Sequence, residues 1–440
     1  MELELLNYKN VLSSNWSMGR WMRTGNSKFQ GELISCFRSC MRNWFVGMFA
    51  LFLLGSMWIF YHETSEPYLM KTLPWLELFP LGSMGEENRS TDVDQPQIKA
   101  TYIRGKEAVE QFRNHLACFS ESGKWVYDPT PRHLPWNYLG DAFASTCDSR
   151  HKWTGPGHVS YEQAEAIERD LDGNISAWLV REELKWVWQT NSSCPFWAVN
   201  RDDLCRRIGS RRNVMVVGDS LNHEISWTFM NHLVLNGTGY SRLGTNNRST
   251  DGVYEMCGDI FGAGNGFKVS FVRNDRLSPV LFPTVNWERN FYEFPWLNLV
   301  DEYDVKLLLM NRGAHYEDDV TYAQALRNIF TILSGRFPHV RVIYRNTQPG
   351  HINCETYYRP LSERQNGSQL PDNYHWADFH RQNQLAAKIV EEFQYIYMDV
   401  ETMLSLRADG HIDKGDCLHY CVPGPLDLSI QYLYNILLLL

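Results

Sequence analysis

The chain has 440 residues, of which 44% are hydrophobic and 21% are charged. That composition is typical of a folded globular protein with one large domain or two moderate ones, and it excludes a largely disordered chain. The net charge of −9 disfavours a nucleic-acid-binding protein, because a phosphate-binding surface needs an excess of basic side chains.

An uncharged run at residues 44–61, WFVGMFALFLLGSMWIFY, follows a basic segment. It is long enough to nearly span the hydrocarbon core of a bilayer. Basic residues precede the run and acidic residues follow it, so the positive-inside rule predicts a cytosolic N-terminus and a lumenal or external remainder. A cleaved signal peptide is the alternative, but the run begins late and lacks a small-residue cleavage site. We therefore expect a type II signal-anchor between a cytosolic tail, residues 1–43, and a stem, residues 62–100.

Two further features favour a lumenal location. Six Asn-x-Ser/Thr sequons follow the span, more than chance gives, and predict surface glycosylation; they are Asn88, Asn174, Asn191, Asn236, Asn247 and Asn366. Eight cysteines also follow it, an even number that predicts four disulfides in an oxidising compartment; they are Cys118, Cys147, Cys194, Cys205, Cys257, Cys354, Cys417 and Cys421. No paired Cys-x-x-Cys zinc pattern occurs, so no metal is expected. Lipid modification of Cys36 and Cys40 stays open.

Residues 101–210 read as an irregular lobe rich in Cys and Trp, with one predicted helix at residues 161–188. Trp125, Trp186 and Trp188 are the candidate acceptor platform, because an aromatic ring packs against the apolar face of a pyranose. A disulfide-stapled aromatic core is the alternative interpretation of the same residues.

From residue 211 to residue 440, short apolar runs alternate with amphipathic helices. The predicted strands are residues 214–217, 305–310, 340–344 and 393–400, and the predicted helices are residues 222–235, 319–334 and 377–392. This alternation indicates an α/β fold with a parallel sheet flanked by helices on both faces. Ligands of such sheets bind beyond the carboxyl ends of the strands, where the sequence places Asp219, Ser220, Asn311, Arg345 and Asp399.

Gly218-Asp219-Ser220 ends the first of these strands and opens a helix. The glycine permits a tight turn, and the helix start offers N–H groups to an oxyanion that develops beside Ser220. Taken alone, the same triplet is equally typical of a helix N-cap. Asn311, at the end of a middle strand, is the candidate second oxyanion donor beside the N–H of Ser220.

Asp416-Cys417-Leu418-His419 lies near the C-terminus. A serine nucleophile needs a base, and the base needs an orienting carboxylate. One short loop can supply both, since Asp416 and His419 are three residues apart. A glycosyltransferase is the competing class, but it usually needs an Asp-x-Asp metal motif. The nearest such strings lie in the stem, at residues 92–94, and in the predicted helix, at residues 170–172.

The linear order of Ser, Asn and Asp-x-x-His is that of the SGNH hydrolase fold. The chain resembles the PC-esterase group of the SGNH/GDSL superfamily, especially the trichome-birefringence-like Golgi polysaccharide O-acetyltransferases. The resemblance covers roughly residues 115–430 and rests on six ordered blocks: CFSESGKWVYD, Trp186-Val187-Trp188 followed by Cys194, VMVVGDSLN, MNRGAHY, YRNTQPGH and DCLHYCVPG. The fourth block departs from the family by one inserted residue between Gly313 and His315.

The resemblance implies an O-acetyltransferase of the Golgi membrane that works by double displacement. His419, oriented by Asp416, deprotonates Ser220, which takes an acetyl group from acetyl-CoA or an acetylated intermediate. A hydroxyl of a polysaccharide or glycan then attacks the acyl-enzyme, and no bound cofactor is expected. Attack by water would make the chain a carbohydrate acetyl-esterase, and a glycan-binding protein without activity is a third possibility. A triad does not decide between transferase and esterase.

Overall fold

The computed structural model of the chain describes residues 106–130, 181–235, 239–245, 252–286, 290–315, 318–366, 373–412 and 416–440. All of them belong to the second of two units of the chain, Trp75–Leu440. The predicted cytosolic tail, anchor and stem lie outside the described residues. Among the helices that are described, none is long and apolar enough to cross a membrane.

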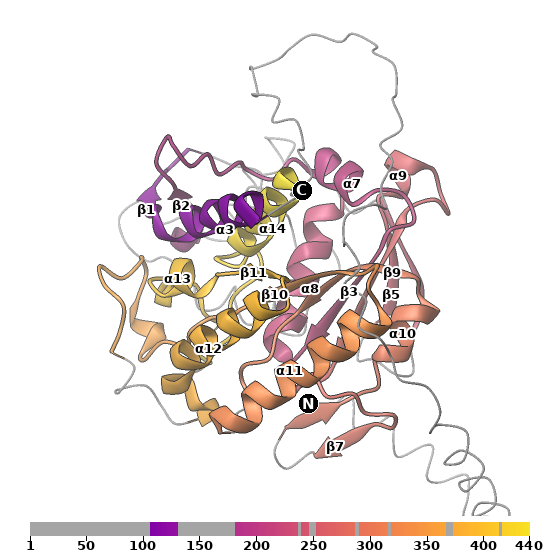
Figure 1. The fold of residues 1–440 in the computed structure, drawn as a ribbon. Coiled ribbons are helices and arrows are strands. Elements are labelled where there is room, and N and C mark those ends of the chain that lie inside the picture. The colour runs from indigo at the N-terminus through magenta and orange to yellow at the C-terminus, as the bar shows by residue number, and fades with distance from the viewer. Residues whose placement is uncertain are drawn as a thin grey trace, which may run out of the picture. The chain divides into compact units, whose positions relative to one another are not determined.

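A seven-stranded sheet, in the order β11-β10-β9-β3-β6-β5-β4, forms the centre of the fold (Figure 1). Its strands are β3 (Asn213–Gly218), β4 (Tyr240–Thr245), β5 (Gly252–Met256), β6 (Phe267–Arg273), β9 (Val305–Met310), β10 (Arg341–Arg345) and β11 (Ile396–Met398). The strands from β11 to β6 are parallel, whereas β5 and β4 are antiparallel to their neighbours. The prediction of a wholly parallel sheet is therefore wrong at one edge. The physical reason is the connection at residues 257–266, which is too short for a parallel crossover.

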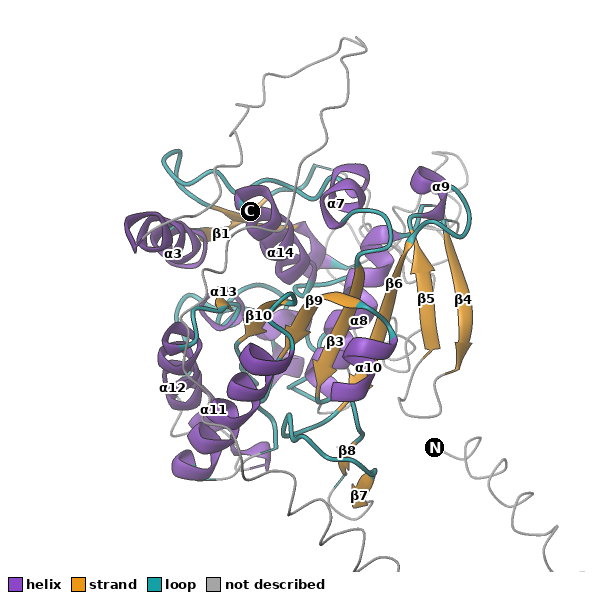
Figure 2. Cartoon of the chain, turned by 45° about the vertical axis from the view of Figure 1, so that its right-hand side comes forward, coloured by secondary structure: helices purple, strands orange, loops and turns teal. Residues whose placement is uncertain are grey.

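Alternate residues of β3 face two separate cores. Val214 and Val216 pack in one hydrophobic cluster with α8 (Ser220–Leu233) and α14 (Asp427–Leu439). Met215 and Val217 pack in another with α10 (Leu297–Glu302), α11 (Asp319–Arg336) and α12 (Phe379–Glu392). Every residue of β3 is buried, as expected of a strand covered by helices on both faces (Figure 2).

Most of the predicted elements are confirmed. The strand at residues 305–310 has the predicted bounds, and the helices beginning near residues 222, 319 and 377 are α8, α11 and α12. The last predicted strand is shorter than expected, since β11 covers only Ile396–Met398. The predicted helix at residues 161–188 is wrong at its end, because Trp186–Gln189 forms β2. Bulky aromatic and β-branched residues favour such a strand, and residues 161–180 lie outside the described part of the chain.

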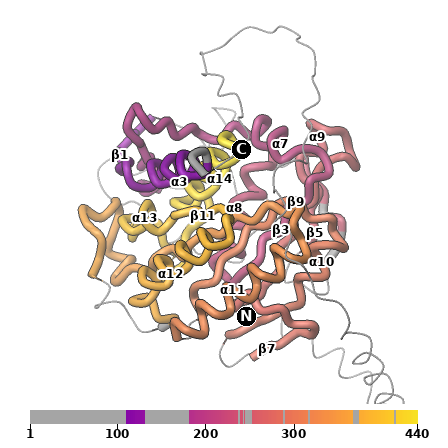
Figure 3. Tube along the Cα trace, viewed as in Figure 1, coloured from indigo at the N-terminus to yellow at the C-terminus, as the bar shows by residue number. Residues whose placement is uncertain are grey.

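The described part of the amino-terminal lobe comprises α3 (Lys106–Glu121), β1 (Lys124–Tyr127), η2 (Glu182–Lys185), β2 and α7 (Arg201–Ile208). Strands β1 and β2 pair antiparallel. Helix α3 lies beside α14 at the other end of the chain (Figure 3). There the hydroxyl of Tyr432 donates to the carbonyl of Leu116 at 2.7 Å. Leu116 and Tyr432 belong to the same core cluster as β3 and α8, so this lobe and the sheet share one core.

A small hairpin extends the carboxyl end of β6. It consists of β7 (Thr284–Asn286) and β8 (Phe291–Glu293). Backbone hydrogen bonds from Asp275 to Tyr292 at 2.9 Å and from Phe294 to Arg273 at 3.0 Å hold it there. The remaining short elements are α9 (Gly258–Phe261), η3 (Cys354–Thr356), η5 (Asn373–Asp378), α13 (Glu401–Leu404) and η6 (Ala408–Gly410).

Candidate active site

Ser220 is the first residue of α8, directly beyond the end of β3. The chain turns there at Gly218, where a side chain would meet Cβ of Asn222 and the carbonyl oxygen of Asn311, each at 2.8 Å. Only glycine fits that approach without moving the neighbouring backbone. The strand end and the helix start are thereby brought together with Ser220 at the edge of the sheet.

Asp219 caps the helix that carries the serine. One carboxylate oxygen accepts the N–H of Leu221 at 3.0 Å, and the other accepts the N–H of Ala314 at 2.9 Å. The side chain is fully buried. The N-cap interpretation of this residue is therefore confirmed, because Asp219 fixes the turn and also binds the loop after β9 to it.

Ser220, His419 and Asp416 form a hydrogen-bonded triad. Nε2 of His419 lies 2.8 Å from Oγ of Ser220, and Nδ1 of His419 lies 2.8 Å from Oδ2 of Asp416. Since Asp416 accepts a hydrogen bond, Nδ1 carries the proton and Nε2 offers its lone pair to the serine hydroxyl. The structure thus brings together the three side chains that the sequence named, across a sequence separation of 199 between Ser220 and His419.

The environment of Asp416 keeps it ionised. Burial raises its pKa, but the hydrogen bond and the charge of His419, with two backbone N–H groups, outweigh burial and hold the pKa below its ordinary value. Those N–H groups belong to Leu418 and His419, and each donates to Oδ1 at 3.1 Å. A carboxylate held in this way favours the imidazolium form that His419 adopts when it removes a proton.

A disulfide fixes the loop that carries the base. Cys417 is bonded to Cys354, and the N–H of His351 donates to the carbonyl of Cys417 at 2.9 Å. The two sulfur atoms and the carboxylate of Glu355 lie close enough together to resemble a metal site. A disulfide has no thiolate to offer a metal, so we interpret this group as a brace for the loop.

Three of the four predicted disulfides pair described cysteines. They are Cys118–Cys194, Cys205–Cys257 and Cys354–Cys417. Cys421 is also disulfide-bonded, and Cys147 lies outside the described residues. Of the predicted glycosylation sites, Asn191 and Asn366 are exposed. The other four, Asn88, Asn174, Asn236 and Asn247, fall on residues that the structure does not describe.

Asn311 lies near Ser220 but is not directed at it. Its buried amide donates to the carbonyl of Arg345 at 3.0 Å and to the hydroxyl of Thr347 at 3.2 Å. Both amide hydrogens therefore point toward the loop after β10. Asp219 already accepts the N–H groups of Leu221, Asn222 and His223, so the N–H of Ser220 itself is the oxyanion donor that this geometry offers.

Arg345 is a buried support for the nucleophile helix. Its Nε donates to Oδ1 of Asn222 at 3.0 Å, and Nη1 donates to Oε1 of Gln348 at 2.7 Å. Burial lowers the pKa of Arg345 to about 10, against the opposing effects of Asp219 and other nearby acidic groups. A guanidinium with that pKa remains charged at neutral pH and links β10 to the start of α8.

The three tryptophans of the candidate acceptor platform lie on β1 and β2. Nε1 of Trp125 donates to the carbonyl of Met403 at 2.8 Å, and Nε1 of Trp188 donates to that of Phe119 at 2.9 Å. Trp188 is only 9% exposed and belongs to the large core cluster, while Trp186 is half-buried. The hairpin of β7 and β8 lies at the carboxyl ends of the parallel strands, as Ser220 does, and in Figures 1 and 2 β1 lies far from β7. The structure does not bring these rings to Ser220.

Two features near the triad were not found by sequence reasoning. Glu224, one turn after Ser220 on α8, is fully buried and accepts the N–H of Tyr420 at 2.9 Å. His315, whose block we noted only for an insertion, lies 3.3 Å from the buried carboxylate of Asp275. The i, i+4 spacing of Ser220 and Glu224 was a usable signal, because it places both side chains on one helix face.

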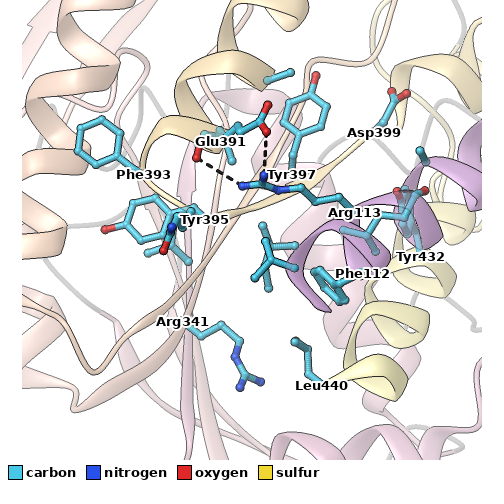
Figure 4. A pocket seen from close by; sticks show the side chains of 18 of the residues that line it. Phe112, Arg113, Arg341, Glu391, Phe393, Tyr395, Tyr397, Asp399, Tyr432 and Leu440 are labelled. Atoms are coloured by element: carbon cyan, nitrogen blue, oxygen red, sulfur yellow. Dashed lines mark hydrogen bonds and ion pairs between the residues drawn. The ribbon is translucent and has the colours of Figure 1, made fainter. Parts of the chain in front are cut away.

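A cavity of about 540 Å³ lies between α3 and the strands β10 and β11. Its wall includes Phe112, Arg341 and Tyr395 (Figure 4). Arg113 donates to a carboxylate oxygen of Glu391 at 2.7 Å across one side. No triad residue lines this cavity, so it is separate from the chemistry described above.

The sequence comparison gives one family match, to part of the chain. A sequence model of the PC-Esterase family, described as a GDSL/SGNH-like acyl-esterase family found in Pmr5 and Cas1p, matches residues 310–436. That range contains Asp416 and His419, but it begins after Ser220 and so does not include the nucleophile. A sequence search of curated proteins finds no match.

Solved structures give weak similarity. A peptidoglycan O-acetylesterase is 9% identical, with a TM-score of 0.33 over 56% of this chain and 97% of that one. The periplasmic domain of a Salmonella ser. Paratyphi A lipopolysaccharide acetyltransferase is 12% identical, with a TM-score of 0.32 over 54% and 89%. A carbohydrate esterase family 2 enzyme of Corynascus thermopiles is 13% identical, with a TM-score of 0.27 over 51% and 65%.

Proposed function

Since this chain is a divergent member of the GDSL/SGNH-like acyl-esterase superfamily, we propose that it transfers an acetyl group to a glycan hydroxyl through an acyl-enzyme on Ser220. One observation carries the proposal, namely the 2.8 Å contacts that join Ser220 to His419 and His419 to Asp416. A glycan as acceptor follows from the resemblance of the sequence blocks to polysaccharide O-acetyltransferases.

The first half-reaction acylates the serine. His419 takes the proton from Oγ of Ser220 while that oxygen forms a bond to the acetyl carbonyl carbon. The carbonyl oxygen becomes an oxyanion beside the N–H of Ser220 at the start of α8, which stabilises it. When the bond to the donor breaks, His419 returns its proton to the leaving group, which is the thiol of acetyl-CoA or the alcohol of an acetylated intermediate.

The second half-reaction transfers the acetyl group. His419 removes the proton from a glycan hydroxyl, whose oxygen attacks the acyl-enzyme, and the bond to Oγ of Ser220 breaks. His419 then returns the proton to the serine. Asp416 stays ionised throughout and stabilises the imidazolium that forms in each half. With water in place of the glycan, the same steps hydrolyse an acetyl ester, which is the alternative function.

The test compares the chain with two serine variants on the same helix. Ser220→Ala removes the nucleophile, while Ser226→Ala removes a hydroxyl that only donates to the carbonyl of His223 at 2.7 Å. We expect p-nitrophenyl acetate hydrolysis to fall to background in Ser220→Ala alone. Equal activity in all three proteins would reject the acyl-enzyme, and retained glycan binding without any hydrolysis would favour the non-enzymatic alternative.

Transferase and esterase are separated by mass. With an acetyl donor and oligosaccharide acceptors, transfer adds about 42 Da to the acceptor, and hydrolysis of an acetylated substrate removes about the same mass. Loss without any gain would identify an esterase.

We also propose that the catalytic unit lies in the Golgi lumen behind a type II anchor at residues 44–61. The exposure of Asn191 and Asn366 supports this orientation. Removal of N-glycans by an endoglycosidase should increase the gel mobility of the chain, and by less in an Asn191→Gln/Asn366→Gln variant. Digestion of the catalytic unit by protease added to intact vesicles would contradict the orientation.

A further inference from the structure

Ionisable side chains from three strand ends gather beside the nucleophile turn. Nε2 of His315, after β9, lies 3.3 Å from Oδ2 of Asp275, after β6. Nε of Arg273, the last residue of β6, donates to the other oxygen of Asp275 at 2.9 Å. The residue before His315, Ala314, donates its N–H to Asp219 at 2.9 Å. Since Asp219 directly precedes Ser220, this bond ties the segment of His315 to the nucleophile turn, although His315 is not part of the triad.

Two aromatic rings flank this imidazole. The ring of Phe291, on β8, has its centroid 5.9 Å from that of His315 at an interplanar angle of 66°. The ring of Tyr374, in η5, lies 5.8 Å away at 85°. Arg276 lies over Phe291, with 4.5 Å between Cζ and the ring centroid. Tyr374 is 38% exposed, so part of this side chain is accessible to a ligand.

The backbone holds Tyr374 in an unusual conformation. Its φ is 59°, and that of the following residue, His375, is 54°. Two consecutive non-glycine residues in the left-handed region are costly for L-amino acids and persist only where the surroundings impose them. Such backbone strain is concentrated at ligand sites. Here its effect is to keep an exposed tyrosine ring against His315.

We propose that His315, Phe291 and Tyr374 form a subsite that binds one sugar ring of the carbohydrate substrate beside Ser220. An aromatic face packs against the apolar face of a pyranose, and an imidazole hydrogen-bonds a ring hydroxyl. The inference rests on the proposed function and deepens it, because it assigns the substrate class to named residues.

The charge state of His315 suits a neutral ligand. Burial lowers its pKa to about 4, against the opposing effect of Asp219, and Arg273 and Arg276 lower it further. The imidazole is therefore neutral at neutral pH, with one N–H and one lone pair. A hydroxyl can both accept and donate, so it matches such a ring better than a phosphate or a carboxylate does. The subsite is thus built for sugar hydroxyls rather than for the charged part of a donor.

The experiment uses the full chain with p-nitrophenyl acetate as acyl donor and a panel of methyl glycosides of neutral pyranoses as acceptors. Release of p-nitrophenolate reports acylation of Ser220, and mass spectrometry of the glycosides reports the use of the sugar. We expect Tyr374→Ala to raise the KM for the glycoside about tenfold more than the KM for p-nitrophenyl acetate, since an aromatic contact of this kind corresponds to about a factor of ten. Tyr374→Phe keeps the ring and should restore most of the glycoside KM.

Tyr127→Ala is the matched control. This tyrosine is 44% exposed on β1, and its variant should leave both KM values as in the wild-type chain. If the wild-type chain releases no more p-nitrophenolate than Ser220→Ala, the proposed function fails. If the wild-type chain is acylated but Tyr374→Ala changes both KM values equally, or no glycoside is used, the subsite is overturned while the acyl-enzyme stands.

Discussion

Glu224 accepts the backbone N–H of Tyr420 at 2.9 Å, and this bond joins the helix of the nucleophile to the loop of the base. Glu224 lies one turn after Ser220, and Tyr420 directly follows His419. The other carboxylate oxygen of Glu224 accepts Nε2 of Gln348 at 3.3 Å. The bond is buried, so it defines the separation of Ser220 and His419 without competition from water.

We therefore expect Glu224→Ala to lower kcat for p-nitrophenyl acetate by about a hundredfold, because a displacement near 1 Å between reacting groups has about that effect. Glu224→Gln should be milder, since its amide oxygen still accepts the N–H of Tyr420. The measurement is kcat and KM for each variant, with thermal unfolding recorded in parallel. A lower melting temperature with unchanged kcat would show that Glu224 stabilises the fold without positioning the triad.

The triad could be predicted from the sequence because each member lies at a position that the sequence marks. Ser220 follows an apolar strand and opens a helix, and Asp416 and His419 lie in one short loop bounded by cysteines. Glu224 is marked only by its i, i+4 spacing from Ser220, and Tyr374 carries no mark of this kind. Their partners, Tyr420 and His315, are distant in sequence, and only the tertiary fold brings each pair together.

The incorrect and undecided predictions also depend on connections and contacts that only the tertiary fold provides. The short connection before β6 makes β5 antiparallel, and residues 239–256 lack the apolar run that would have revealed β4 and β5. The sequence left the three tryptophans open between acceptor platform and core. Trp188 belongs to the core, because its indole N–H is bonded to the carbonyl of Phe119. Composition alone does not report such a contact.

Asp416→Asn should reduce kcat by about ten-thousand-fold, as loss of the orienting carboxylate does in serine triads. The amide also favours the wrong tautomer of His419. The pKa of Asp416 is held below its ordinary value by His419 and by backbone N–H groups, against the effect of burial. In the wild-type chain this pairing therefore stabilises the fold above the ordinary pKa of aspartate, and that contribution is lost as the pH falls through the lowered pKa.

The free energy of unfolding, measured from about pH 6 down to about pH 3, checks this effect on stability, because that range brackets the ordinary pKa of aspartate. The wild-type chain should lose more stability over that range than Asp416→Asn does. Parallel curves for the two proteins would contradict the shifted pKa of Asp416.

Loss of the disulfide Cys354–Cys417 should lower kcat, whereas its effect on the melting temperature should be no larger than that of losing another disulfide. A matched control exists in Cys205–Cys257, which lies away from the triad. The sequence separations are 63 and 52 residues, so the chain-entropy effect of the two bonds differs by only about 0.2 kcal/mol.

We expect paired Ser substitutions at either disulfide to lower the melting temperature by similar amounts, measured by thermal unfolding. Only Cys354→Ser/Cys417→Ser should reduce kcat for p-nitrophenyl acetate strongly, because that bond braces the loop between Asp416 and His419. Equal kcat in the two double variants would show that the loop is held by its hydrogen bonds alone.

Asp275 and His315 make opposite contributions to the pH dependence of stability. Burial raises the pKa of Asp275 to about 7, with Asp219 acting in the same direction and Arg273 against it. Burial lowers the pKa of His315 to about 4. Between pH 4 and the ordinary histidine value, the folded pair holds one proton, on the carboxyl, and the unfolded pair also holds one, on the imidazole. The pair therefore gives no slope of stability against pH there.

Single substitutions should uncover the two opposite slopes. In His315→Gln, the folded chain binds the extra proton, on Asp275, so stability should fall as the pH rises from 4 toward 7. In Asp275→Asn, the unfolded chain binds the extra proton, on His315, so stability should rise with pH up to the ordinary histidine pKa. Each slope is at most about 1.4 kcal/mol per pH unit relative to the wild-type chain. Chemical denaturation at intervals across this range measures both, and slopes of the same sign in the two variants would contradict the opposed pKa shifts.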